Sequence, residues 1–284
     1  MAVQRIDFHG QPAAELLLPT GDRVVASLHG AQVLSWRTAD GTERLYLSPQ
    51  AIFDGQAAIR GGVPVCFPQF NQRGPLPKHG FARNLPWRIA PEPGDGATLV
   101  LALSDDESTR RLWPVQFELR LQVALAPSRL RIALVARNTG DAPWSFTAAL
   151  HTYLHVDDAA EARLDGLQGR PRWDAVRDER FVESSPALRF GEEFDSVFTA
   201  VPGAGLTLVQ PAGRLAVTQS DTCPETVVWN PGPALSQRLA DMPDDGWRHM
   251  LCVEAASIDA PVPLAPGARW EGWQELRVLP ASAG

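Results

Sequence analysis

Residues 117–141 read FELRLQVALAPSRLRIALVARNTGD. Apolar residues fill every second position of the first half, at Phe117, Leu119, Leu121, Val123 and Leu125. This alternation places them on one face of a β-strand. A turn over 126–129 leads into a second strand that contains Ile132 and Leu134, and residues 138–141 close it. The stretch therefore predicts an antiparallel hairpin with one buried face.

The same alternation recurs on both sides of this hairpin. It predicts two short strands around Gly30 within 23–37, and further strands over 97–106, 144–156, 206–210, 214–219, 225–229, 248–254 and 269–278. Helical periodicity is weak and predicts one short helix within 104–114, started by Ser104 or Asp105 and stopped at Pro114. Many short strands separated by turns indicate an all-β protein, a sandwich or a barrel with few short helices.

The length of 284 residues allows one large domain or two small ones. No linker rich in Ser, Gly or Pro divides the chain, and no repeat of about 20–50 residues is visible. Large all-β domains run to about 250 residues. We therefore expect a single domain over 1–284, with a loose tail at 279–284.

The composition is that of a globular protein, with 44% hydrophobic and 21% charged residues. A net charge of −7 argues against nucleic acid as a partner. The N-terminal residues do not resemble a signal peptide, and no apolar run of about 18 residues predicts a membrane span. Cys66, Cys223 and Cys252 lie in apolar or strand-like contexts and are expected to be buried thiols, not catalytic ones. These features predict a cytoplasmic protein with no membrane partner, and we expect a monomer.

A second stretch, AAIRGGVPVCFPQFNQRGPLPKHGFAR at 57–83, holds three arginines and Lys78, the only lysine of the chain. Its glycine pair and four prolines exclude a long helix, and its residues alternate too poorly for an ordinary strand. We expect an extended, shaped path of backbone that holds polar side chains in fixed positions.

Two histidines occur in AALHTYLHV, at His151 and His155. On a helix this spacing would suit half of a zinc site, but the surrounding residues favour a strand, where both share a face with Tyr153. No glutamate follows His151 as a metalloprotease motif requires, and no cysteine is near it in sequence. We therefore expect no metal, and from these residues alone His151 could equally be an interior histidine with no chemical role.

Four other residues stand out in their local sequence. Glu254 follows the apolar run MLCV, so it either points outward at a strand end or has a raised pKa and a role in chemistry. His79 lies in the proline-shaped stretch four residues before Arg83, where a lone histidine is usually solvated. Asp195 precedes an apolar segment, which is a common place for an acid. Trp229 lies where a strand meets a turn and is the tryptophan best placed to stack on a sugar ring.

Six blocks, in this order, resemble the aldose 1-epimerase (mutarotase) superfamily, and more narrowly its hexose-6-phosphate branch. The blocks are AIRGGVPVCFPQF, PKHGFARNLPW, LHTYL, FDSVF, ETVVWNP and LCVE. The resemblance covers roughly residues 20–278. It implies a large antiparallel β-sandwich of the galactose mutarotase type, with no cofactor and with a small phosphosugar as substrate.

The resemblance also implies roles for individual residues. It assigns His151 as the acid and Glu254 as the base, with His79 and Asp195 near the sugar hydroxyls and ring oxygen, and Gln69 as another polar contact. It matches Arg60 and Arg83 to positions that face the phosphate. The resulting expectation is that glucose 6-phosphate, or a related hexose 6-phosphate, exchanges its α and β anomers by ring opening and closure. That chemistry needs a protonated His151 and a Glu254 whose pKa is raised toward neutrality.

The chain departs from the family pattern at three places. Residues 255–257 replace the usual Pro-Gly-His after the base, Asn71 replaces a common glycine, and residues 232–234 replace a common aromatic residue and lysine. Three alternatives stay open: a carbohydrate-binding module, a phosphosugar sensor without turnover, and a metal-dependent isomerase.

Overall fold

The hairpin predicted over 117–141 forms as β8 (Phe117–Ala126) and β9 (Arg129–Asn138) in the computed structural model, which describes residues 3–91, 97–200 and 205–280. Every second residue of β8 is buried, and the two strands pair without interruption from Phe117–Asn138 to Ala126–Arg129. Ser128 turns the chain with a φ of 56°. Each fully buried leucine on this face contributes about 1.5–3 kcal/mol to folding.

A nine-stranded sheet extends from this hairpin in the order β15-β12-β17-β18-β21-β9-β8-β7-β6. Its remaining strands are β6 (Arg88–Ile89), β7 (Thr98–Ser104), β12 (Arg163–Asp165), β15 (Ala187–Arg189), β17 (Leu206–Gln210), β18 (Gly213–Gln219) and β21 (Arg269–Leu279).

An eight-stranded sheet has the order β14-β13-β16-β19-β20-β10-β5, with β11 also paired to β20. These strands are β5 (Val65–Cys66), β10 (Trp144–Leu150), β11 (Tyr153–His155), β13 (Pro171–Asp174), β14 (Glu179–Val182), β16 (Phe194–Thr199), β19 (Glu225–Asn230) and β20 (Met250–Leu264). A third, four-stranded sheet contains β1 (Gln4–Phe8), β2 (Gln11–Leu17), β3 (Arg23–Ser27) and β4 (Val33–Arg37) in sequence order.

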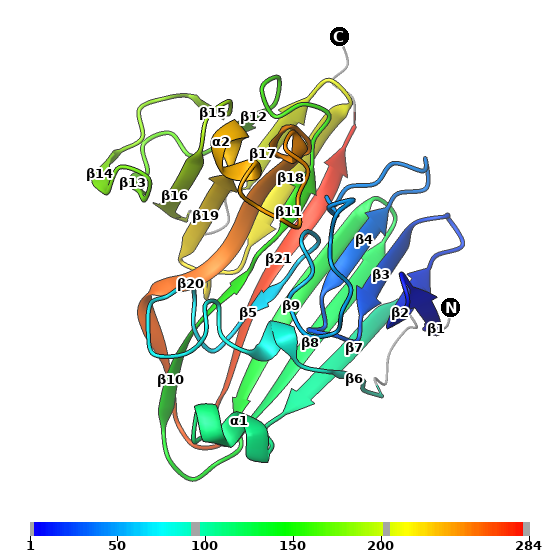
Figure 1. The fold of residues 1–284 in the computed structure, drawn as a ribbon, viewed down its shortest axis with the longest axis vertical. Helices are drawn as coiled ribbons and strands as arrows, with labels where there is room; N and C mark the ends of the chain where they lie inside the picture. The colour runs from blue at the N-terminus through cyan, green and yellow to red at the C-terminus, as the bar shows by residue number, and fades with distance from the viewer. Residues whose placement is uncertain (1–2, 92–96, 201–204, 281–284) are drawn as a thin grey trace.

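The sheets enclose one apolar core. Leu121 of the nine-stranded sheet, Val253 of the eight-stranded sheet and Trp36 of the four-stranded sheet belong to the same buried cluster. All pairs between the described strands are antiparallel, so the predicted antiparallel β-sandwich is confirmed. Figure 1 shows β1–β4 (blue) at one side of the molecule and β13–β16 at the other.

Helices are few and short among the described residues: α1 (Glu107–Leu112), α2 (Gly232–Ser236) and two 3₁₀ turns at Ala82–Asn84 and Gly246–His249. The predicted helix starts after Asp106 and not after Ser104 or Asp105, because Asp106 and Thr109 form a capping box. Within the described part of the chain, no helix is long and apolar enough to cross a membrane.

The predicted strand 144–156 is divided into β10 and β11 by a break at His151 and Thr152. The backbone N–H of His151 donates to the carbonyl of Pro64, and the hydroxyl of Thr152 donates to Gln274. The break is a local turn, in which the backbone N–H of Thr152 donates to the carbonyl of Leu150, while β10 and β11 keep the same register along β20. Of the predicted loose tail 279–284, Leu279 is the last residue of β21 and pairs with Arg214, whereas residues 281–284 lie outside the described part of the chain.

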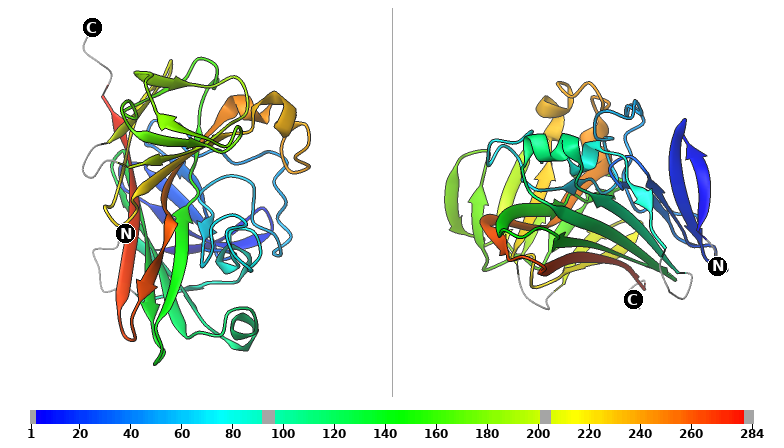
Figure 2. Two further views of the ribbon diagram at one scale, coloured as in Figure 1. Left: turned by 90° about the vertical axis from the view of Figure 1, so that its left-hand side faces the viewer. Right: turned by 90° about the horizontal axis from the view of Figure 1, so that it is seen from below.

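Within the stretch 57–83, residues 62–68 follow an extended path along β10 and β11, whereas residues 71–79 form turns, so the predicted extended path covers only part of the stretch. Gly62 and Gly80 both have positive φ, and a Cβ at either position would lie 2.1 Å from a carbonyl oxygen, of Val33 and Phe67 respectively. Only glycine fits so close to a neighbouring backbone. Figure 2 shows this stretch and α2 on the same side of the sheets, where they border the cavity described next.

Candidate active site

A cavity of about 420 Å³ lies on the face of the eight-stranded sheet that points away from the core. This volume is within the range of small-molecule sites. Six of the seven residues that the sequence singles out as site residues line it: Arg60, His79, Arg83, His151, Asp195 and Glu254. They come from the stretch 57–83, the β10–β11 junction, β16 and β20, so segments far apart in the sequence meet here.

Strand alternation explains why Glu254 faces this cavity. On β20, Leu251 and Val253 pack in the core between the sheets, whereas Cys252 belongs to a separate cluster on the opposite face. Glu254 therefore shares that opposite face with Cys252. The carboxyl group is almost completely buried, so it does not point outward at a strand end.

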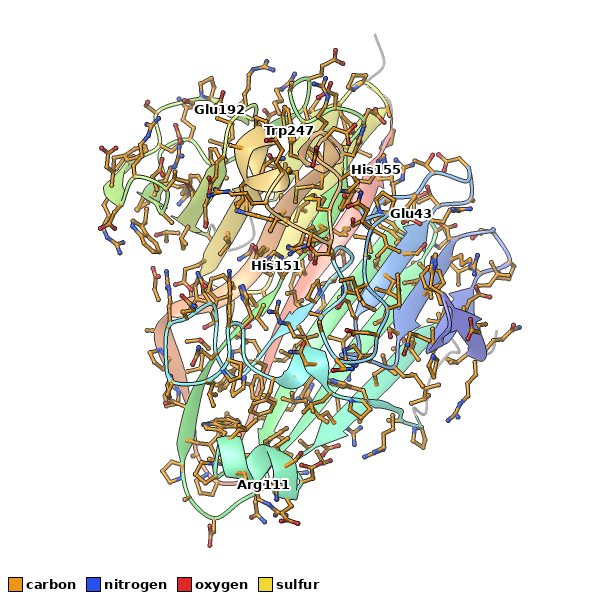
Figure 3. The ribbon with its side chains drawn as sticks, viewed as in Figure 1. Glu43, Arg111, His151, His155, Glu192 and Trp247 are labelled. Atoms are coloured by element: carbon orange, nitrogen blue, oxygen red, sulfur yellow. The ribbon has the colours of Figure 1, made fainter. Side chains whose placement is uncertain are left out.

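His151 is held by its backbone and by two aromatic rings. Its ring stacks on Tyr153, with centroids 4.9 Å apart and planes 17° apart, and Trp229 meets it edge-on at 6.2 Å. In Figure 3 His151 lies over the middle of the molecule and His155 lies apart from it. Tyr153 lies two positions after His151 on a predicted strand, so both side chains are expected on one face. This spacing is the signal in the sequence that could identify Tyr153 as part of the site.

His151 Nε2 lies 3.2 Å from Oε1 of Glu254. Burial raises the pKa of Glu254 well above its usual range, and the nearby charge of Asp195 raises it further. Burial lowers the pKa of His151, with further lowering from His79 and Arg83. Without substrate, both shifts favour the uncharged forms, a protonated Glu254 and a neutral imidazole. This differs from the protonated His151 that the proposed chemistry requires at its start.

His79 has a φ of 64° and presents its ring to the same cavity. Its Nδ1 accepts a hydrogen bond from the backbone N–H of Asn71 at 3.3 Å and lies 3.2 Å from the thiol sulfur of Cys66. Burial and the positive charges of Arg83 and Lys78 lower the pKa of His79 to about 3. The ring is therefore neutral at physiological pH, with its proton on Nε2, and serves as a hydrogen-bond donor.

Gln69 is the one predicted site residue that does not line the cavity. Its amide nitrogen donates to the carbonyls of Asn71 and Leu76, and its amide oxygen accepts from the backbone N–H of Leu76. These three bonds hold the loop that carries His79. The structure thus gives Gln69 a bracing position instead of the expected contact with substrate.

The two arginines differ in their surroundings. Arg60 is already paired, because its Nε donates to Asp241 at 3.1 Å and its Nη1 donates to the hydroxyl of Tyr153 at 3.1 Å. Among the described residues, Arg83 donates only to the backbone carbonyl of Lys78, and none of them is a partner for its buried Nε. Lys78 also lines the cavity, and sequence reasoning did not select it although it is the only lysine.

Asp195 faces the cavity from β16, next to Trp229 on β19. Burial raises the pKa of its carboxyl to about 6, and the neighbouring charge of Glu193 adds to this effect. The side chain is therefore mostly ionised at pH 7. An ionised carboxylate accepts hydrogen bonds only, which suits it to hold sugar hydroxyls.

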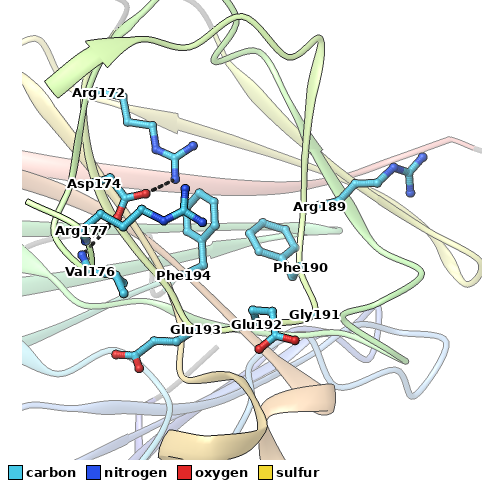
Figure 4. Close-up of a pocket in the computed structure, with 10 residues that line it drawn as sticks. All are labelled: Arg172, Asp174, Val176, Arg177, Arg189, Phe190, Gly191, Glu192, Glu193 and Phe194. Atoms are coloured by element: carbon cyan, nitrogen blue, oxygen red, sulfur yellow. Dashed lines mark hydrogen bonds and ion pairs between the residues drawn. The ribbon is translucent and has the colours of Figure 1, made fainter. Parts of the chain in front are cut away.

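A larger cavity of about 610 Å³ lies between β13 and the segment 189–194. Figure 4 shows its lining, in which Arg172 is paired with Asp174. Arg172 also pairs with Glu183, so this cation is neutralised within the protein. None of the described residues that line this cavity is a histidine or a cysteine. The smaller cavity holds the groups capable of proton transfer, and we take it as the candidate active site.

Comparisons with known proteins identify the family of the chain. The family model described as Aldose 1-epimerase matches residues 16–277. A relative from Cenchrus ciliaris, named "Putative glucose-6-phosphate 1-epimerase", is 39% identical over 90% of this chain and 81% of its own. A relative of the same name from Escherichia coli (strain K12) is 37% identical over 85% of this chain and 83% of its own.

Solved structures show the same fold. The crystal structure of a "putative mutarotase (YeaD)" from Salmonella typhimurium matches with a TM-score of 0.88 and 31% identity, over 99% of this chain and 94% of that one. A structure from Lactobacillus acidophilus, described as a galactose mutarotase related enzyme, matches with a TM-score of 0.75 at 17% identity, over 99% of this chain and 98% of that one. The predicted galactose mutarotase-like sandwich is therefore confirmed.

Proposed function

The chain belongs to the aldose 1-epimerase family, and we propose that it interconverts the α and β anomers of a hexose 6-phosphate, with glucose 6-phosphate as the first candidate. The observation that carries this proposal is the buried pair of His151 and Glu254, 3.2 Å apart in a cavity large enough for a hexose phosphate. The names of the relatives support the same activity and substrate.

Anomer exchange needs a base and an acid on the same sugar. We assign Glu254 as the base that removes the proton from the anomeric hydroxyl. His151 then donates a proton to the ring oxygen as the bond between C1 and that oxygen breaks. The aldehyde turns about the C1–C2 bond, and closure on the other face returns both protons by the reverse steps. Each group acts as acid in one direction and as base in the other, with no net uptake of protons.

The proton that His151 needs as the acid can come from Glu254. The reactive arrangement, an ionised Glu254 with a protonated His151, contains the same number of protons as the ligand-free pair. It is reached by moving one proton across the 3.2 Å contact. A phosphate dianion bound nearby favours the positive charge on His151. The low pKa of His151 in the ligand-free protein is thus compatible with its proposed role as acid.

Positive groups at one end of the cavity suit the phosphate. Arg83 and Lys78 line this end, and the unpartnered Nε of Arg83 leaves a guanidinium donor free for an oxyanion. Arg60 contributes positive charge, while its bonds to Asp241 and Tyr153 also hold the ring on which His151 stacks. His79 and Asp195 are proposed to hold the sugar hydroxyls.

We also propose that the protein acts as a monomer in the cytoplasm. The three cysteines are all free and buried, which suits a compartment that keeps thiols reduced. Size-exclusion chromatography with light scattering would test the monomer, and fractionation of cells would test the location.

The direct test is exchange NMR between the anomers of glucose 6-phosphate and of free glucose. We expect faster exchange with the phosphorylated sugar, and activity that survives EDTA. Binding of the sugar phosphate without faster exchange would instead indicate a sensor. Loss of activity in EDTA, restored by one metal ion per chain, would indicate a metal-dependent isomerase.

A further inference from the structure

Cys252 is a buried soft nucleophile that the proposed chemistry does not use. It lies two residues before Glu254 on β20, so both side chains point to the same face of the sheet. It is fully buried and free of any disulfide. Its neighbours across the ladder are Trp229 and Tyr153, the same two rings that contact His151.

Cys252, His151 and Glu254 form a donor cluster. One ligand atom from each, a sulfur, a ring nitrogen and a carboxylate oxygen, lie within 4.8 Å of one another. Sulfur, nitrogen and oxygen donors of this kind are the ligands that zinc binds in proteins. Three protein ligands also leave a fourth position open, which the cavity next to the cluster would supply.

The cluster has unused coordination capacity. Two buried atoms, Oε2 of Glu254 and Nδ1 of His151, have no hydrogen-bond partner among the described residues. Water cannot easily reach the carboxyl group either, because Glu254 is only 1% exposed. Buried polar atoms without partners are uncommon and need a reason. Substrate contacts would satisfy some of this capacity, and so would a cation.

We propose that Cys252, His151 and Glu254 bind a thiophilic divalent cation of the zinc class, and that this cation inhibits the enzyme. The bound ion would coordinate both groups that transfer protons and would close the cavity to the anomeric centre. Binding would replace the proton of the Cys252 thiol, and any proton held on the coordinating atoms of His151 and Glu254, by bonds to the metal, and these protons would go to solvent. No oxidation or reduction takes part. The inhibition rests on the proposed function, but the binding itself does not.

Binding is tested first, and independently of activity. The chain, stripped with EDTA and dialysed, is titrated with Zn²⁺ in competition with a chromophoric chelator, and separately with Co²⁺. We expect one site per chain and, with Co²⁺, a sulfur-to-metal charge-transfer absorption from Cys252. Absence of that absorption from a protein that binds Co²⁺, or no binding at all, would overturn the proposal without any variant.

Two variants locate the site. Cys252→Ala is expected to weaken Zn²⁺ binding by about tenfold or more, since even an outer-shell change around a metal has effects of that size. Cys223→Ala is the matched control, because Cys223 is also free and buried but is not part of the cluster. It should bind Zn²⁺ as the parent does. Equal binding by the parent and Cys252→Ala would place the ion elsewhere.

Inhibition is then measured as the ratio of each protein's rate with Zn²⁺ to its own rate in EDTA. We expect inhibition of the parent and of Cys223→Ala, and a tenfold or greater shift in the inhibiting concentration for Cys252→Ala. EDTA should raise or preserve the rate, the opposite of what a metal-dependent isomerase would show. If the chain binds Zn²⁺ through Cys252 but no preparation exchanges anomers, the proposed function is wrong, whereas the proposed Zn²⁺ site is still supported.

Discussion

At the scale of the residue, His151 and Glu254 act as one proton-transfer unit. Each alters the chemistry of the other, because the two side chains are in contact at 3.2 Å in a buried position. The sequence indicated an unusual position for Glu254, since a carboxylate follows an apolar run. It could not indicate that His151 lies opposite, because the two residues are about a hundred positions apart and only the fold brings them together.

The first prediction is that His151→Ala and Glu254→Gln each lower kcat for anomer exchange by about 10²-fold or more. The double variant should be little worse than either single one, because the groups act together in one transition state. Exchange NMR gives the rates, and circular dichroism of each variant checks that the fold is retained. Near-normal exchange by Glu254→Gln would show that the base has been assigned wrongly.

Arg60 and Arg83 illustrate what residue-level sequence reasoning misses. In the sequence both are arginines of one shaped stretch and were given the same expected role. The partners of Arg60, Asp241 and Tyr153, lie far away along the chain and were not foreseen. The folded structure thus gives different partners to two arginines for which the sequence pattern predicts the same role.

The second prediction separates their roles. Arg83→Ala should raise KM for glucose 6-phosphate by about tenfold or more, because a hydrogen bond to a charged group contributes roughly 1.5–3 kcal/mol. It should leave the slow turnover of free glucose nearly unchanged. Arg60→Ala should lower kcat on both sugars, because it also releases Tyr153 beneath His151. Steady-state kinetics with glucose 6-phosphate and free glucose measures these changes. If Arg83→Ala lost the same activity with both sugars, Arg83 would not bind the phosphate.

At the scale of the element, long alternating strands were predictable and short ones were not. The alternation of β8 continues over ten residues, whereas β9 has a continuous buried run at 132–136. The turn is shorter than the predicted 126–129, because Ala126 and Arg129 still pair across the hairpin. The strands β12, β13, β14 and β15 are three or four residues long, too short to show a period. The break between β10 and β11 is not visible in the sequence either, because it is a local turn from Thr152 N–H to the carbonyl of Leu150 that no glycine or proline marks.

The third prediction concerns the loop that carries His79. Gly80→Ala should lower both stability and kcat/KM, because its φ is +73° and a Cβ would lie 2.1 Å from the carbonyl oxygen of Phe67. Gly267→Ala is the control, with a φ of +72° but nothing within 4 Å of the added Cβ. That change should have only the conformational penalty of about 1–2 kcal/mol and should leave activity intact. Thermal unfolding and kinetics measure both, and equal effects would mean that the close contact relaxes freely.

At the scale of the whole molecule, the core residues of all three sheets form one contiguous cluster. We propose on this ground that the chain is a single domain, and the fourth prediction is one cooperative unfolding transition. Tryptophan fluorescence, far-UV circular dichroism and loss of activity should give the same midpoint in a denaturant titration. Separate midpoints, with the four-stranded sheet lost first, would show two folding units.

The fifth prediction concerns the pH dependence of stability that the cavity imposes on the whole molecule. The pKa of Asp195 rises from 3.8 to about 6 on folding, so the folded protein binds this proton more tightly than the unfolded chain. Stability therefore falls as pH rises from about 4 to 6, and above that range the buried charge remains a constant penalty. Asp195→Asn should leave stability unchanged near pH 4 and raise the midpoint of thermal unfolding at pH 7.

Asp40 provides the control of opposite sign. Hydrogen bonds from Thr38 and Thr42 lower its pKa to about 2, so its ionised form stabilises the fold above the unfolded value of 3.8 and loses this effect as pH falls toward 2. Asp40→Asn should thus lower the midpoint at pH 7, where Asp195→Asn raises it. Scanning calorimetry of the parent and both variants from pH 2 to 8 measures the two trends. If Asp195→Asn failed to gain stability with rising pH, the carboxylate would already have a partner in the folded protein, and the free acceptor proposed for the sugar hydroxyls would not exist.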